Sequence, residues 1–372
     1  MIAGREPSMK HGSAHKLWSN VKSWSAPRAG SGLLGLNPAL FLVAGALVAV
    51  LPRAEEKLAF RSVEGRALEK TFVQHSSMDL TEMKVSIEGP DGSHDPEIEL
   101  PKLTIVDDET IEFTDLTAAA GDGKPKKLKR SFTKIENSNT FSGGGEDEEG
   151  GSEERKNVSP LADKTVVFTW DADAEEFSAA WDEDQEGDDD VLEALVEDAD
   201  FRAWLPKKDV AEGDTWEIDT SEFNNLQEPS GPMAYRPEDA PEDYDSGDDP
   251  DDMRKNVKGD FKATFKGLRE EDGVQVGVIA FEAELETNSE RELEQEEGPS
   301  ITSTLANQVK LEGELLWDVK GGHFHALSCD SDFKLQSSQK RVIEVPQGSF
   351  TIEERRGFEG KKTYRFTCGE KK

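Results

Sequence analysis

The last third of the chain alternates apolar and polar residues, and this pattern predicts long strands. From Ile301 to Trp317, every second position is mostly apolar and the positions between them are mostly polar. Successive side chains of a strand point to opposite faces, so this segment is expected to bury one face and expose the other. The same pattern predicts five long antiparallel strands, a β-meander, between Val257 and Cys368.

Turn signals divide this meander. Asp272-Gly273 is a two-residue hairpin signal, and Lys320-Gly321-Gly322 ends the strand that starts at Ile301. The final part is interpreted as two strand pieces, around Phe350 to Ile352 and Tyr364 to Cys368, joined near Glu359-Gly360. Both faces are apolar between Val276 and Phe281, which predicts that the middle of the sheet is covered on both sides.

The first half of the chain predicts further strands, followed by one helix. Met83, Val85 and Ile87 alternate with polar residues, and Thr165 to Trp170 is a mostly apolar run. Asp188 to Leu205 carries apolar residues at helical spacing behind three aspartates, which suit the positive end of a helix dipole. The pattern therefore predicts one helix that packs on the sheet.

Two polar segments are predicted to be disordered insertions. Residues 137–160 centre on SGGGEDEEGGSEER, and residues 229–256 contain five prolines within a dense acidic run. Both have too few apolar residues to offset the entropy lost on ordering. Residues 55–372 are therefore expected to form a single, mainly β domain: a curved antiparallel sheet or partial barrel with one packed helix and two disordered acidic loops.

The N-terminal 54 residues predict export. They hold six basic residues and one acidic residue, and the run from Leu33 to Leu51 carries no charge. This arrangement is typical of a signal peptide. The run is also close to the roughly 20 residues that span a bilayer, so an uncleaved membrane anchor is the competing interpretation. The mature protein is expected in the periplasm, in the cell envelope or outside the cell, with residues 33–51 as its only membrane contact if they are retained.

Charge narrows the list of partners. The chain has 79 acidic and 44 basic residues, which gives a formal net charge of −35. Such a field repels nucleic acid. The sequence therefore predicts no nucleic-acid partner.

One acidic stretch matches the calcium-loop template in part. Asp182, Asp184, Glu186 and Glu193 stand at the spacing of that template, with Gly187 at its glycine position. The fifth position is Glu instead of Asp or Asn, and acidic residues are dense throughout this region. These four residues are weak metal candidates. The alternative is that they are solvent-exposed acidic residues that lead into the predicted helix.

Histidine and cysteine give two more candidates. His323 and His325 are two residues apart on a predicted strand, so they would share a face and could share a metal, although no third ligand is evident. Cys329 and Cys368 lie at apolar positions of predicted strands and are the candidate disulfide of an exported protein, with two separate buried thiols as the alternative.

Two segments carry a resemblance. Residues 200–218, DFRAWLPKKDVAEGDTWEI, and residues 123–136, GKPKKLKRSFTKIE, resemble segments of an uncharacterised family of bacterial exported proteins. The resemblance implies a signal segment, an acidic mature chain and a long-stranded antiparallel sheet. It implies no activity and no residue roles.

Three functions compete at this stage. The sequence contains no G-x-S-x-G, phosphate loop, dinucleotide fingerprint or H-E-x-x-H motif, so it predicts neither an enzyme nor a cofactor. The first expectation is a non-catalytic envelope or secreted protein, binding or structural, whose partner is another protein or a surface polymer. The alternative is a carrier of an apolar, lipid-like small molecule in the concave face of the sheet. A hydrolase with an unrecognised site is the third.

Overall fold

The computed structural model describes residues 54–90, 92–144, 151–183, 185–241, 256–293, 300–345 and 348–371. The predicted signal or anchor, residues 33–51, lies outside them. The described residues all fall in one compact unit. No helix within these ranges is long and apolar enough to cross a membrane.

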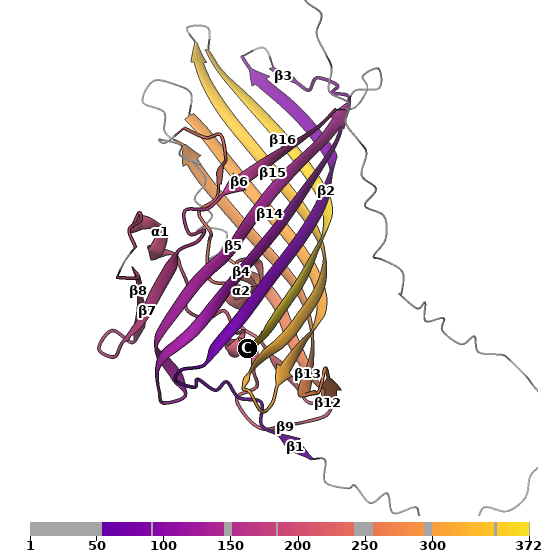
Figure 1. Ribbon diagram of the computed structural model, residues 1–372. Coiled ribbons are helices and arrows are strands. Elements are labelled where there is room, and N and C mark those ends of the chain that lie inside the picture. The colour runs from indigo at the N-terminus through magenta and orange to yellow at the C-terminus, as the bar shows by residue number, and fades with distance from the viewer. Residues whose placement is uncertain are drawn as a thin grey trace, which may run out of the picture. The chain divides into compact units, whose positions relative to one another are not determined.

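Strands dominate the structure (Figure 1). The strands are β1 (Glu55–Glu56), β2 (Ala67–Gly89), β3 (Gly92–His94), β4 (Lys102–Gly121), β5 (Lys124–Gly144), β6 (Gly151–Val158), β7 (Thr165–Asp171), β8 (Glu176–Trp181), β9 (Val210–Ala211), β10 (Thr215–Glu217), β11 (Arg236–Pro237), β12 (Lys258–Glu271), β13 (Val274–Leu293), β14 (Ser300–Asp318), β15 (His323–Val345) and β16 (Gly348–Glu370). The helical elements are α1 (Asp190–Glu193), η1 (Arg202–Trp204), η2 (Thr220–Glu222) and α2 (Phe223–Gln227).

One 14-stranded antiparallel sheet contains all strands except β1 and β9, which pair with each other. Its main path runs β10-β12-β13-β14-β15-β16-β2-β4-β5-β6-β11, and β7 and β8 continue from the first half of β5. The sheet curls without closing into a barrel. The predicted fold class, a curved antiparallel sheet or partial barrel, is therefore confirmed.

The predicted hairpins of the C-terminal meander are present. Asp272 and Gly273 connect β12 to β13 with φ angles of 50° and 81°, the left-handed conformation that a two-residue turn between twisted strands requires. The break predicted near Glu359-Gly360 is wrong, because β16 is one continuous strand. It pairs with β15 and β2 on its two edges, and only a bulge next to Phe358 interrupts its register with β2.

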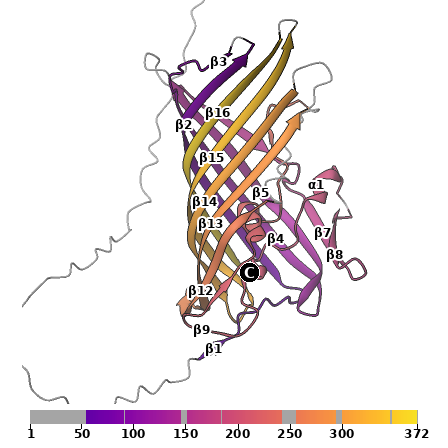
Figure 2. The same cartoon turned by 180° about the vertical axis from the view of Figure 1, so that it is seen from behind.

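The segment that follows α1, residues 194–235, fills the concave side of the sheet, and we call it the inner segment. Phe201, Trp204, Phe223 and Leu226 are at most 1% exposed. The Trp204 ring packs edge-on against Phe261 and Phe281, each with a ring-centre distance of 5.0 Å. Figures 1 and 2 both show α2 within the curve of the sheet. The chain thus supplies its own filling for this part of the concave face.

The long helix predicted from Asp188 to Leu205 is wrong. Only α1 and the 3₁₀ turn η1 are helical there. The carbonyl groups of Val196 and Glu197 accept hydrogen bonds from the Arg130 guanidinium, at 2.8 and 2.9 Å, instead of helical N–H groups. Tertiary contacts with the sheet therefore replace the backbone hydrogen bonds of a helix, and the apolar residues pack inward from an irregular segment.

The insertion predicted at residues 137–160 is mostly strand. The second half of β5 and all of β6 pair through it, and residues 145–150 lie outside the described ranges. The Asn157 amide donates to the side-chain oxygens of Asn137 and Asn139, at 2.5 and 2.7 Å. Side-chain amides and the backbone ladder thus order a segment that has almost no apolar residue.

The second predicted insertion is ordered in its first part. Ser230 is fully buried and Met233 is 3% exposed, so residues 229–233 belong to the filled interior, whereas Ala234, Arg236 and Glu238 are exposed. Residues 242–255 lie outside the described ranges.

Candidate functional site

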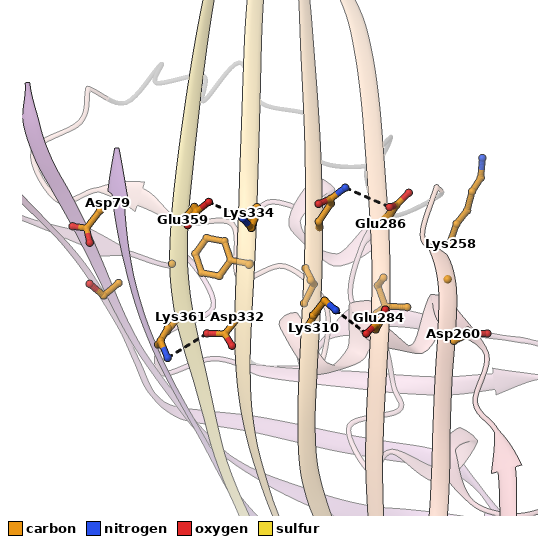
Figure 3. A pocket seen from close by; sticks show the side chains of 17 residues that line it. Asp79, Lys258, Asp260, Glu284, Glu286, Lys310, Asp332, Lys334, Glu359 and Lys361 are labelled. Atoms are coloured by element: carbon orange, nitrogen blue, oxygen red, sulfur yellow. Dashed lines mark hydrogen bonds and ion pairs between the residues drawn. The ribbon is translucent and has the colours of Figure 1, made fainter. Parts of the chain in front are cut away.

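The outer face of the sheet carries a trough of about 750 Å³ (Figure 3). Two transverse rows of side chains form its walls. Cross-strand register aligns one row as Lys258, Glu286, Gln308, Lys334, Glu359 and Asp79 and the other as Asp260, Glu284, Lys310, Asp332, Lys361 and Ser77. Between them lies the row Gly259, Leu285, Val309, Phe333 and Gly360, which stands one position away along each strand and therefore belongs to the opposite face. We call this feature the charged trough.

Opposite charges of the charged trough pair across neighbouring strands. Lys310 lies 2.8 Å from Glu284, and Lys334 lies 2.7 Å from Glu359. Lys310 donates a hydrogen bond to Glu284 and so lowers the pKa of that carboxyl. These side chains are more than half exposed, so solvent screens each pair and it contributes little to stability.

A second trough of about 760 Å³ lies beside the first. It shares the row that contains Glu284 and Lys310, and its other wall includes Lys262, Glu282 and Glu312. The outer face is therefore corrugated by parallel rows of charged side chains, which suits contact with a charged, extended partner.

The inner face holds a buried ionic cluster, formed by Lys70, Asp115, Arg130 and Asp200. The Lys70 ammonium lies 2.9 Å from Asp115 and 2.7 Å from Asp200. The Arg130 guanidinium donates to both oxygens of Asp115, at 2.8 and 2.9 Å. Against the effect of burial, Arg130 and Lys70 lower the pKa of Asp115.

The buried ionic cluster also joins the sheet to the inner segment. Arg130 is fully buried and donates to the Ser230 hydroxyl, at 2.5 Å, as well as to the two carbonyls named above. Asp200 and Ser230 come from the inner segment, whereas Lys70, Asp115 and Arg130 belong to β2, β4 and β5. The cluster is enclosed by protein, so its role is to fix the inner segment in place.

A second inner group of polar residues surrounds Glu109 on β4. Glu109 lies directly opposite Gln74 on β2, and Lys362 aligns with Ser76 in the next row. Burial raises the pKa of Glu109 to about 7, and burial lowers the pKa of Lys362. The Tyr235 hydroxyl of the inner segment interacts with the Glu109 carboxyl. This group can therefore exchange a proton near neutral pH.

Three of the four acidic calcium-loop candidates fall within the described residues. The Asp182 carboxylate accepts hydrogen bonds from the Lys129 ammonium at 2.8 and 3.0 Å. Glu186 and Glu193 are exposed, and Asp184 lies outside the described residues. Within the described ranges, no group of three histidine, cysteine or acidic side chains is placed to hold a metal.

A β-bulge separates the two histidines. Phe324 pairs with Trp317 and Ala326 pairs with Leu316, which makes His325 the extra residue of the bulge. Nδ1 of His323 lies 2.7 Å from the Phe324 carbonyl oxygen, and burial lowers the pKa of this histidine. The expectation that His323 and His325 share a strand face is therefore wrong.

The predicted disulfide is not formed. Cys329 and Cys368 are both free and buried. Cys329 lies opposite Tyr364, so Cys368 is four residues farther along β16, roughly 13 Å away at strand spacing. A disulfide needs Cα atoms within about 7 Å, and the alternative of two separate buried thiols holds. Burial raises the pKa of the Cys329 thiol to about 12, which keeps it protonated.

Sequence reasoning missed the buried ionic cluster, although a signal for it exists. Lys70 stands between Leu68 and Phe72 in the inward register, and Arg130 stands between Leu128 and Phe132 in the same way. A charge at the centre of an apolar row predicts a buried partner of opposite sign. Which partner meets it depends on strand order.

Comparisons with known proteins give no functional lead. No family model and no curated protein matches this chain. The β-barrel of the InvG secretin domain from the Salmonella SPI-1 injectisome aligns with a TM-score of 0.14 and 7% identity, over 83% of this chain and 64% of that chain. Pseudomonas aeruginosa OccK2 aligns with a TM-score of 0.09 and 6% identity, over 81% of this chain and 98% of that chain. Similarity this low carries no argument about fold or function.

Proposed function

We propose that this protein is a non-catalytic exported protein, of the cell envelope or secreted, that acts by binding another protein or a surface polymer. The filled concave face carries this proposal. Phe201, Trp204, Phe223 and Leu226 occupy space that a carrier would leave for its ligand. A packed interior supports a role for the outer surface.

The charged trough supplies such a surface. Its two walls cross six neighbouring strands, and both contain exposed lysines and carboxylates. Exposed charges add little to stability, but they steer and select charged partners. A polymer or a protein segment with charges of both signs suits this arrangement.

A carrier of an apolar molecule is the second candidate, because part of the concave face lies beyond the inner segment. Four inward-facing apolar side chains in that part are only half-buried: Met78, Phe333, Leu335 and Phe358. An apolar ligand laid against them would complete their burial, at about 25 cal/mol for each Å² removed from water.

Native mass spectrometry separates the two functions. The protein is purified from an exporting host without detergent, and phosphatidylethanolamine is then offered. We expect the mass of the chain alone before and after. A reproducible extra mass of lipid size would replace the binding proposal with the carrier.

A charge-reversal pair tests the surface. Lys310→Glu with Lys334→Glu should reduce cosedimentation with isolated cell-envelope polymer, because two lysines in opposite walls of the charged trough become acidic. Lys127→Glu with Lys208→Glu, which changes the charge equally at two exposed lysines outside both troughs, is the matched control. Equal cosedimentation of both variants would remove the charged trough from the proposal.

A further inference from the structure

Strand β8 is an open edge of the sheet, whereas β12 and β6, near the two ends of the main strand path, are partly covered by short strands of the chain itself. β10 pairs along β12, and the Ile218 amide adds a hydrogen bond of 2.9 Å to the Phe261 carbonyl. β11 pairs with the end of β6. Among the residues that the structure describes, β8 pairs with β7 alone, and Figures 1 and 2 both place it on the outside of that hairpin.

The free edge of β8 presents a defined set of backbone groups. The Asp182 amide donates to the Thr165 carbonyl at 3.0 Å, so Asp182 directs its backbone groups toward β7. Backbone groups alternate in direction along a strand. Phe177, Ala179 and Trp181 therefore direct their N–H and C=O groups away from β7, toward the free edge.

Nothing in the sequence of β8 protects this edge. Edge strands are usually blocked by lysine, proline, a bulge or an inward charge. The six residues of β8 are EFSAAW, with a single charge at the first position. Phe177, Ala179 and Trp181 turn their side chains to the core, and the exposed side chains of Ser178 and Ala180 are small.

Acidic residues flank both ends of β8. Asp171 ends β7, and Asp173 and Glu175 lie in the turn before β8. Asp182, which accepts hydrogen bonds from Lys129, and Glu183 follow β8 directly. The chain as a whole carries a formal charge of −35. These carboxylates repel an acidic strand, including a second copy of this chain, and attract a strand with basic residues at both ends.

We propose that the free edge of β8 binds an extended segment of a partner protein that carries basic residues on both sides of its pairing region. The segment adds a strand beside β8, so that main-chain hydrogen bonds to Phe177, Ala179 and Trp181 supply affinity and the acidic flanks select the partner. This inference rests on the proposed binding function and names the kind of partner.

Peptide probes test the proposal on the full chain. One ten-residue peptide alternates threonine and valine between paired lysines, and a matched peptide has glutamates in place of the lysines. We expect the lysine peptide to slow amide hydrogen exchange in residues 177–181 and to bind about tenfold or more tightly than the glutamate peptide, with the difference shrinking at high salt. Equal binding of both peptides, or no protection by the lysine peptide, overturns the proposal.

Two variants locate the site. Ala179→Pro removes an N–H that points to the free edge, where proline is compatible with an edge strand, so folding should persist while peptide binding falls about tenfold or more. Ala180→Ser changes an exposed side chain, keeps every edge N–H and should bind normally. Unchanged binding by a folded Ala179→Pro variant overturns the proposal.

The protein alone supplies a third outcome. Slow amide hydrogen exchange in residues 177–181 without peptide, together with a doubled mass in light scattering, would show that a second copy of this chain occupies the edge. That result would overturn the proposal of a partner segment. Loss of peptide binding would leave the native mass and polymer measurements unaffected, so failure of this inference is distinguishable from failure of the proposed function.

Discussion

The two faces of the sheet use the same kind of ion pair with different physical results. On the inner face, Lys70 and Asp115 are 2.9 Å apart with side chains 1% and 4% exposed. On the outer face, Lys310 and Glu284 are 2.8 Å apart with side chains 71% and 74% exposed. The nitrogen–oxygen distances of the two pairs are nearly equal, but water screens the outer pair and is excluded from the inner pair. Burial therefore decides whether a pair holds the fold together or remains available to a partner.

The largest effect is expected when one partner of the buried ionic cluster is removed. Asp115→Ala leaves Lys70 and Arg130 in a buried site with one fewer counter-charge, and should lower the free energy of unfolding by about 3–5 kcal/mol. Urea denaturation measures this change. The control Glu284→Ala removes an equally close carboxylate from the outer face, and similar losses for both variants would contradict the comparison.

Glu109 is expected to make stability depend on pH. Its folded pKa of about 7 lies above the ordinary value of 4.5. Between these values the folded state holds a proton that the unfolded state has released, so stability is greatest at the acidic end of this window. It falls as pH rises toward 7, by at most about 3 kcal/mol.

Urea denaturation between pH 4.5 and 7 checks this dependence. Glu109→Gln should reduce the fall, with the buried Glu197, whose pKa is raised to about 6, contributing the remainder. Glu286→Gln on the outer face should leave the fall in place. A variant lacking Glu109 that keeps the full pH slope would show that another group is responsible.

A smaller effect is expected at the amide cluster that orders β6. Asn157→Ala removes hydrogen bonds to Asn137 and Asn139 and should cost about 1–2 kcal/mol. Hydrogen exchange should rise mainly in residues 151–158, because β6 is near an edge. Ser152→Ala, on the same strand, is the control. Uniform destabilisation of the whole sheet would mean that β6 is not a separate local unit.

The smallest effect is expected in the charged trough. Lys310→Ala should leave the free energy of unfolding almost unchanged, and any change should shrink in 1 M salt. If the free energy of unfolding fell by several kcal/mol, this exposed pair would stabilise the fold as strongly as the buried pairs. The contrast between the two faces would then be wrong.

Local sequence determined the regular parts of this fold. Period-two alternation from Ile301 to Trp317 specifies a strand with two unlike faces, and Asp272-Gly273 specifies a hairpin turn. These signals are local because strand faces and two-residue turns depend on neighbouring residues alone. The mainly β class and the antiparallel meander were predictable for that reason.

Only the tertiary structure decided where the polar segments and charges lie. Helical spacing from Asp188 to Leu205 gave way to hydrogen bonds from Arg130. Residues 137–144 and 151–158 became strands because an edge of the sheet was available to pair with them. The four members of the buried ionic cluster span residues 70–200 of the chain. Strand order brings them together, and no local pattern encodes strand order, because it depends on contacts between distant parts of the chain.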